Sequence, residues 1–146
     1  MLKTSMVGRL AAGVTALAAG ATTIVAGPTA AFAADVNPKS ASAVCGSGFS
    51  VVDSFNDDGW AYVYLLYNSR SGENCVVTMK QKNLGTKTRV SAWLETEDNV
   101  KSDPGNYEYY AGPVRLKAQG KCVRFGGEVK VNGQVTFYSS PWGHCG

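Results

Sequence analysis

His144 is the only histidine of the chain, and histidine is the commonest general base in enzymes. It stands between Gly143 and Cys145, and no Gly-x-Ser-x-Gly elbow elsewhere in the sequence supplies a nucleophile for it. We therefore expect His144 to be a surface residue and not a catalytic base.

The carboxylates are a second potential source of chemistry. Glu95 and Glu97 have the alternate spacing that a glycosidase pair could use, but acidic residues at the end of a strand are usually solvated. Asp53, Asp57 and Asp58 do not follow the spacing of a calcium loop, and Asp57-Asp58 suits a turn. Nucleotide, haem and flavin motifs are also absent from the sequence. We predict no catalytic residue, no metal site and no cofactor.

The sequence contains four cysteines, which are candidates for either zinc binding or disulfides. Zinc sites use close ligand pairs such as Cys-x-x-Cys, and none occurs here. In an oxidising compartment two disulfides are then expected, with three possible pairings. We favour Cys45–Cys75 and Cys122–Cys145, on the expectation that each closes across neighbouring strands.

Aromatic side chains are numerous, and they are the best candidates for a binding surface. By alternation Trp93 falls on the polar face of its strand, Trp60 adjoins a turn, and three tyrosines precede Gly112-Pro113. These possible binding residues are Trp93, Trp60, Tyr107, Tyr109 and Tyr110. Exposed rings could stack on sugars or dock a protein, whereas a small β core also fills itself with aromatics.

The start of the sequence is typical of a secretory leader. Lys3 and Arg9 precede an uncharged run from Leu10 to Ala26, and Ala31-Phe32-Ala33 offers small residues to a signal peptidase. We predict a signal peptide over residues 1–33 and a secreted product. The apolar run is short for a membrane helix, and no cysteine adjoins the cleavage site, so we expect neither membrane insertion nor a lipid anchor.

The length of the chain favours a single domain, and its small net charge argues against a nucleic-acid partner. The chain has 146 residues, 17% of them charged, and a formal net charge of +3, so a dedicated nucleic-acid binder is not expected. Residues 34–44 are predicted to be a flexible leader with little to bury, followed by a single β domain over residues 45–146.

Short alternating segments and turn residues indicate an all-β fold. Residues 88–96 alternate cleanly, and Asn132-Gly133 joins residues 128–131 and 134–138 in a hairpin. Other segments predict about seven or eight short strands in all, arranged as a small antiparallel β-sandwich or open barrel, with no helix after residue 33.

Three local predictions concern individual segments. Phe49, Val51 and Phe55 should share one face of a strand, and in the segment from residue 75 to 82 Cys75, Val77 and Met79 should lie opposite Thr78 and Lys80. Pro104-Gly105 should form a turn. Residues 107–118 should form one strand bent at Gly112-Pro113, where proline implies an edge or a bulge.

Several short motifs occur in a characteristic order across residues 44–146. They are Cys45-Gly46-Ser47-Gly48-Phe49, Asn74-Cys75-Val76-Val77-Thr78, Ser91-Ala92-Trp93-Leu94, Tyr110-Ala111-Gly112-Pro113-Val114, Gly120-Lys121-Cys122-Val123 and Gly143-His144-Cys145-Gly146. Together they resemble the spore-associated protein A family of filamentous, spore-forming actinobacteria. Phe125-Gly126-Gly127 stands where this resemblance suggests Trp-Gly-Gly.

The resemblance implies a small secreted protein found with the spore surface, and it supplies no catalytic residues. We therefore expect a non-enzymatic extracellular protein held on the spore or cell envelope by non-covalent contacts with a glycan or another coat protein. Two alternatives remain. One is a carbohydrate- or envelope-binding module that uses exposed aromatics. The other is a secreted protease inhibitor with Asp98–Asn106 as its loop and Lys101 as its reactive residue.

Overall fold

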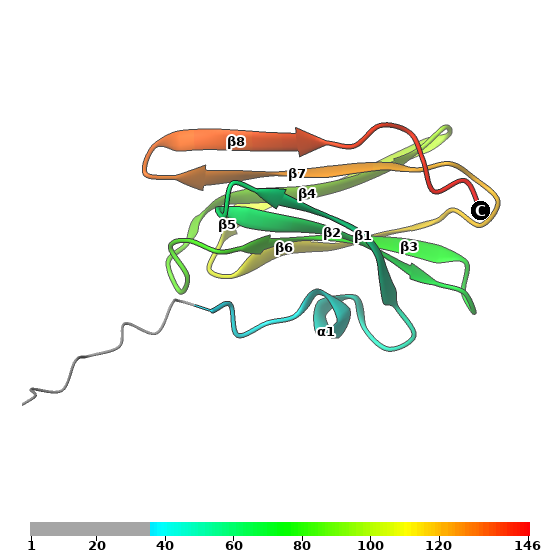
Figure 1. Cartoon of the computed structure of the whole chain (residues 1–146), viewed down its shortest axis with the longest axis horizontal. Helices are drawn as coiled ribbons and strands as arrows, with labels where there is room; N and C mark the ends of the chain where they lie inside the picture. The colour runs from blue at the N-terminus through cyan, green and yellow to red at the C-terminus, as the bar shows by residue number, and fades with distance from the viewer. Residues whose placement is uncertain (1–35) are drawn as a thin grey trace, which may run out of the picture. The chain divides into compact units, whose positions relative to one another are not determined.

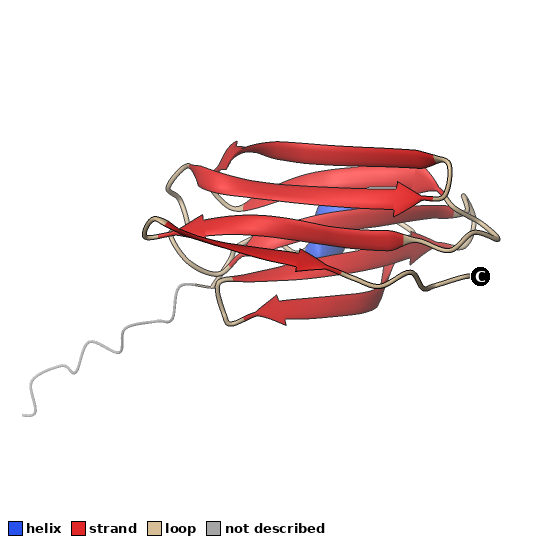
Figure 2. Cartoon of the chain, turned by 90° about the horizontal axis from the view of Figure 1, so that it is seen from above, coloured by secondary structure: helices blue, strands red, loops and turns tan. Residues whose placement is uncertain are grey.

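The computed structural model describes residues 36–146, so the predicted signal peptide lies outside the described residues. Eight strands form two four-stranded antiparallel sheets that pack face to face, which confirms the predicted all-β sandwich (Figure 1, Figure 2). Sheet A has the order β1 (Ser50–Asp57), β2 (Ala61–Asn68), β3 (Glu73–Lys80), β6 (Tyr110–Lys117). Sheet B has the order β5 (Asn99–Tyr107), β4 (Thr88–Thr96), β7 (Arg124–Val131), β8 (Gln134–Ser139).

The main core lies between the two sheets. It is built from inward side chains of β2, β3 and β6 in sheet A and of β4 in sheet B, and it is closed by residues near the start of β7. Its buried members are Val63, Leu65, Val76, Val90, Ala92, Leu94, Ala111, Val114, Leu116, Ala118, Val123 and Phe125. The clean alternation predicted for residues 88–96 is confirmed, because Val90, Ala92 and Leu94 are all fully buried.

A second core covers the outer face of sheet A. The short helix α1 (Ala41–Cys45) lies on that face, away from sheet B, as Figure 1 shows, and it packs with Leu66, Val77 and Met79. The expectation of no helix after residue 33 is therefore wrong. The predicted leader also buries Ala41, and Asn37 is hydrogen-bonded to the carbonyls of Lys80 and Tyr109. Both faces of β3 are consequently covered, and Thr78 and Lys80 face the interior.

Strand β1 contains an irregularity that the sequence pattern does not reveal. The register with β2 shifts between Val51 and Asp53, so that Val51 pairs with Leu66 while Phe55 pairs with Val63. Leu66 belongs to the outer core of sheet A and Val63 to the core between the sheets. The prediction that Val51 and Phe55 share a face is therefore wrong, because a bulge inserts a residue and reverses the alternation.

Strand β5 accounts for the second difference in strand assignment. Pro104-Gly105 does not form a turn but lies within β5, paired with β4 at the edge of sheet B, where a missing N–H is tolerated. Tyr107 ends β5 and Tyr110 begins β6, so residues 107–118 are not one strand. The expected irregularity at Gly112-Pro113 is present, since the register of β6 on β3 shifts there.

The edge strands β1 and β8 close one side of the sandwich. The rings of Phe55 and Tyr138 stack with centroids 3.8 Å apart, and Thr136 donates a hydrogen bond to Asp57. Within residues 36–146, no helix has the length and apolar character needed to cross a membrane.

Candidate functional site: an aromatic face on sheet B

Two exposed aromatic rings, Phe137 and Trp142, gather with the half-buried Trp93 on the outer side of sheet B. Trp93 on β4 and Phe137 on β8 lie with ring centroids 6.4 Å apart and planes inclined by 12°. The Arg124 guanidinium lies 5.8 Å from the centroid of Trp93 and 5.3 Å from that of Trp142, so it connects the two indoles. We call Trp93, Arg124, Phe137 and Trp142 the aromatic face.

The position of Trp93 depends on a glycine on the neighbouring strand. Trp93 pairs with Gly126 of β7, and a Cβ at Gly126 would approach the indole ring to 2.5 Å. Any side chain at this position would displace the ring. The absence of a side chain at Gly126 thus allows the indole to lie across β7 towards β8. The preceding Phe125 is fully buried in the core, so a tryptophan at that position would pack inside and would not reach a ligand.

The charged groups of this face are paired with each other. Glu95 on β4 accepts two hydrogen bonds from the Arg124 guanidinium, at 2.6 and 3.0 Å. Arg89 on β4 donates to Glu128 on β7. Each pair joins the two central strands of sheet B beside the rings. Such pairs contribute little stability at the surface, but they fix the orientation of the guanidinium between the indoles.

The C-terminal tail, residues 140–146, brings Trp142 to this face. The Cys122–Cys145 disulfide and an antiparallel bridge between Val123 and Gly143 hold the tail beside the start of β7. His144 extends from the same tail to Asp53 on β1, with a ring nitrogen 2.9 Å from the carboxylate. The structure has the favoured pairing of all four cysteines, although the second disulfide ties a tail to a loop and the first ties α1 to β3.

The aromatic residues predicted from the sequence lie in three separate places. Trp93 is on the aromatic face, and Trp60 packs in a small cluster with Ala61, Val129 and Val131. Tyr107, Tyr109 and Tyr110 line an open hollow of about 710 Å³ at the turn between β5 and β6. Each of these five side chains is half-buried, so they do not form the single exposed row that would favour binding.

The sequence reasoning did not include Phe137 or Trp142 among the site residues. Phe137 is 64% exposed and Trp142 45% exposed, the largest exposures of any phenylalanine or tryptophan among the described residues. The alternation of side chains along residues 134–138 could have predicted that Phe137 faces away from the core. Its proximity to Trp93, however, follows from the pairing of β4 with β7, which no local pattern specifies.

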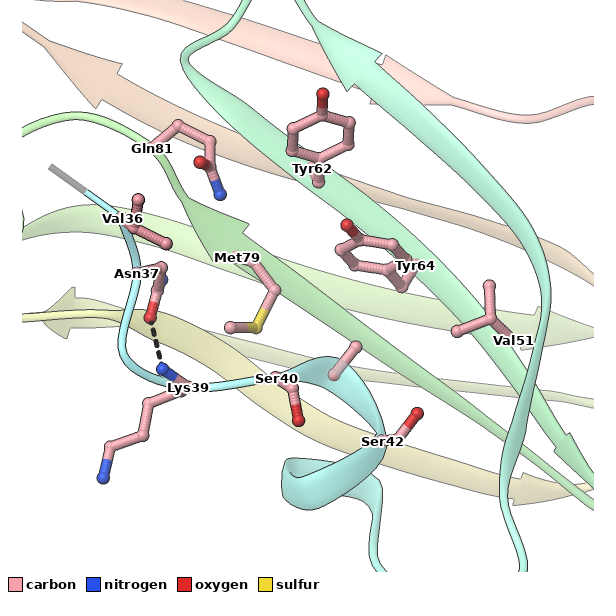
Figure 3. A pocket seen from close by; sticks show the side chains of 11 residues that line it. Val36, Asn37, Lys39, Ser40, Ser42, Val51, Tyr62, Tyr64, Met79 and Gln81 are labelled. Atoms are coloured by element: carbon pink, nitrogen blue, oxygen red, sulfur yellow. Dashed lines mark hydrogen bonds between the residues drawn. The ribbon is translucent and has the colours of Figure 1, made fainter. Parts of the chain in front are cut away.

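A groove of about 490 Å³ lies on the opposite side of the molecule, on the outer face of sheet A. Figure 3 shows Tyr62, Tyr64 and Met79 on its floor and the segment from Val36 to Ser42 along one side. Its side chains are partly committed to the fold. The Tyr62 hydroxyl accepts a hydrogen bond from Asn56, and Asn37 holds the N-terminal segment against β3. We do not assign this groove as the site.

The segment predicted as an inhibitor loop is not a loop. Residues 99–107 form β5, paired along its length with β4. Lys101 points from a regular strand, opposite Leu94, and so lacks the bowed backbone that a protease would cleave. The loop prediction for Asp98–Asn106 is therefore wrong, because a polar strand at a sheet edge has the composition of a loop.

Asp103 in this strand has a structural role. Its carboxylate accepts hydrogen bonds from the Tyr107 hydroxyl, at 2.5 Å, and from the Gly112 N–H, at 2.7 Å. It therefore joins the edge strands β5 and β6 of the two sheets.

The tyrosines predict an alkaline limit to stability. The hydrogen bond to Asp103, with burial, raises the pKa of Tyr107, and burial raises the pKa of Tyr64 and of Tyr138. Unfolded tyrosines ionise first, near pH 10, so the free energy of unfolding should fall as the pH rises above about 10. Lys80 opposes this trend, since its pKa is lowered by burial.

The test is urea unfolding between about pH 8 and pH 11, since this range brackets the ordinary tyrosine pKa. The Tyr107→Phe variant should lose less stability over that range than the wild type. Equal losses in the two proteins would contradict the assignment to Tyr107.

These features define a class of protein: a β-sandwich with two disulfides, a helix on one outer face and aromatic rings on the other. The chain is 42% identical over 112 residues to spore-associated protein A of Streptomyces coelicolor, an alignment that covers 73% of this chain and 68% of the relative. The chain belongs to the spore-associated protein A family. No family model and no solved structure matches it.

Proposed function

We propose that this protein is exported, does not turn over a substrate, and remains on the spore surface through non-covalent contacts of the aromatic face. The name of its relative refers to spores, and the observation that carries the proposal is the continuous arrangement of Trp142, Arg124, Trp93 and Phe137 on one face. Exposed apolar groups that gather on one surface commonly mark an interaction site.

Two further observations support this reading. The disulfides are what an oxidising, extracellular compartment allows, and the leader pattern predicts export. His144 contacts the Asp53 carboxylate, and within residues 36–146 no serine or threonine hydroxyl is hydrogen-bonded to it, so this contact links the tail to β1 and activates no nucleophile. A protein that stays on the spore without a covalent link must bind through part of its own surface. The aromatic face is the best candidate, because it carries Phe137 and Trp142, the most exposed large rings of residues 36–146.

Spore retention tests this proposal. The protein, expressed with its own leader and collected from the medium, is mixed with spores that have been stripped of surface protein. The wild type should survive a water wash and elute in detergent. A Phe137→Ala/Trp142→Ala variant should be largely lost in the wash, because two exposed rings each worth about 1 kcal/mol are removed.

Val36→Ala serves as the matched control, because Val36 is 79% exposed and lies away from the aromatic face on the groove of sheet A. It should be retained like the wild type. Equal retention of the double variant and the wild type would rule out the aromatic face as the point of attachment.

A further inference from the structure

We propose that the ligand of the aromatic face is a neutral, extended polysaccharide whose sugar rings stack on Trp142, Trp93 and Phe137. This inference rests on the proposed function, since it names the chemistry of the surface that the same face would contact. It is carried by three properties of the face: the pairing of its charges, the fixed backbone positions of its rings and the hydrogen-bonding groups beside them.

The charges beside the rings favour a neutral ligand. Arg124 is held by Glu95, and Arg89 by Glu128, so each cation next to the rings already has an anionic partner. An anionic ligand would have to displace a carboxylate to reach either guanidinium, and a cationic ligand would have to displace an arginine. Lys130 lies two residues nearer the β7–β8 turn than Glu128 and pairs with Val135, not with Phe137. A ligand without charge leaves both pairs intact.

The backbone positions that carry the rings are fixed before any ligand arrives. Trp93 lies against Gly126, Phe137 stands on a regular strand, and Trp142 is fixed by the Cys122–Cys145 disulfide and the Val123–Gly143 bridge. Little backbone conformational entropy is therefore lost on binding. Because the rings follow one another across β4, β7 and β8, an extended ligand can contact several of them at once.

Hydrogen-bonding groups accompany the rings, as a sugar requires. The C–H face of a pyranose is apolar and stacks on an aromatic ring, while its equatorial hydroxyls project from the edge and need partners. The Arg124–Glu95 pair lies between the indoles, and the Arg89–Glu128 pair lies beside Phe137, whose strand partner is Glu128. Paired side chains of this kind offer both donors and acceptors to hydroxyl groups.

Affinity electrophoresis of the secreted protein tests the inference, with hydroxyethylcellulose as the neutral polymer and carboxymethylcellulose as its anionic counterpart. The wild type should be retarded by the neutral polymer, no more strongly by the anionic one, and equally at low and high salt. Phe137→Ala and Trp142→Ala should each weaken the retardation about fivefold, which corresponds to one lost stacking contact. Val36→Ala should behave like the wild type.

The outcomes separate this inference from the proposed function. Binding to the anionic polymer alone, with loss in salt, would overturn the neutral ligand. In a second outcome, the wild type fails to bind chitin, cellulose and hydroxyethylcellulose while the Phe137→Ala/Trp142→Ala variant is still washed from spores. That result would overturn the polysaccharide ligand and point to a protein partner on the spore. Loss of polymer binding in both ring variants, without loss of spore retention, would instead overturn the proposed function.

Discussion

Replacing Lys80 by methionine is expected to lower the free energy of unfolding by about 3 kcal/mol, because a buried charged donor is lost from three acceptors. Lys80 is fully buried, and its ammonium group donates to the carbonyls of Asn83, Thr86 and Tyr107 at 3.0, 2.7 and 2.9 Å. Methionine would fill the same volume while leaving these carbonyls without a donor.

The electrostatics of Lys80 agree with a structural role. Burial lowers the pKa of Lys80, and the nearby Glu108 carboxylate opposes that change. The three carbonyls supply the hydrogen bonds that the ammonium gives up in leaving water, and we infer that it stays charged at neutral pH. The side chain thereby connects the end of β3 in sheet A to the loop that leads into sheet B and to the end of β5.

Urea unfolding at neutral pH measures the effect, with Lys82→Met as the control. Lys82 is exposed and two residues further along the same segment, so its replacement should change stability by less than about 0.5 kcal/mol. Hydrogen exchange should locate the damage in residues 80–88 and at the β5–β6 turn. A Lys80→Met protein as stable as Lys82→Met would show that water replaces the ammonium at no cost.

Lys80 also illustrates what the sequence can and cannot predict. Alternation correctly separated Thr78 and Lys80 from Cys75, Val77 and Met79. The polar face was nevertheless the inner one, because α1 covers the apolar face and sheet B covers the other. A strand buried on both sides carries no local mark that tells which face meets which layer.

In the other elements too, features set by neighbouring residues were predictable, whereas features set by distant parts of the chain were not. The hairpin around Asn132-Gly133 was predictable, since both residues adopt the positive φ that such a turn requires, 50° and 84°. The bulge in β1 was not, and it reversed the faces of Val51 and Phe55. Strand β5 has few apolar residues because it forms a sheet edge, so its composition resembled that of a loop.

The candidate site depends almost wholly on non-local pairing. Trp93 was predicted to face outward from the pattern of its own strand, because it alternates with the apolar row and falls among polar residues. Phe137 and Trp142 join it only because β7 lies between β4 and β8 and because Cys122 holds the tail. Residues from three segments meet on the face, and the sequence separations between them exceed any periodicity that a strand pattern can express.

Removal of the Cys45–Cys75 disulfide by a Cys45→Ala/Cys75→Ala double substitution should lower the free energy of unfolding by about 3.6 kcal/mol on the chain-entropy model. The bridge closes a loop with a sequence separation of 30 and joins α1 to β3, with both cysteines buried in the outer core. A five-residue helix has too few hydrogen bonds to persist alone, so α1 depends on this link and on its packing.

The variant should therefore lose hydrogen-exchange protection in residues 36–49 first, while β4 and β7 in sheet B remain protected. A Cys122→Ala/Cys145→Ala variant provides the comparison, because its loop has a similar separation of 23 but closes the tail. It should lose about as much stability and should instead release Trp142, weakening retention on spores. Undiminished protection of α1 without Cys45–Cys75 would mean that the contacts of Ala41 and Cys45 with sheet A hold the helix unaided, and that the disulfide acts only on the unfolded chain.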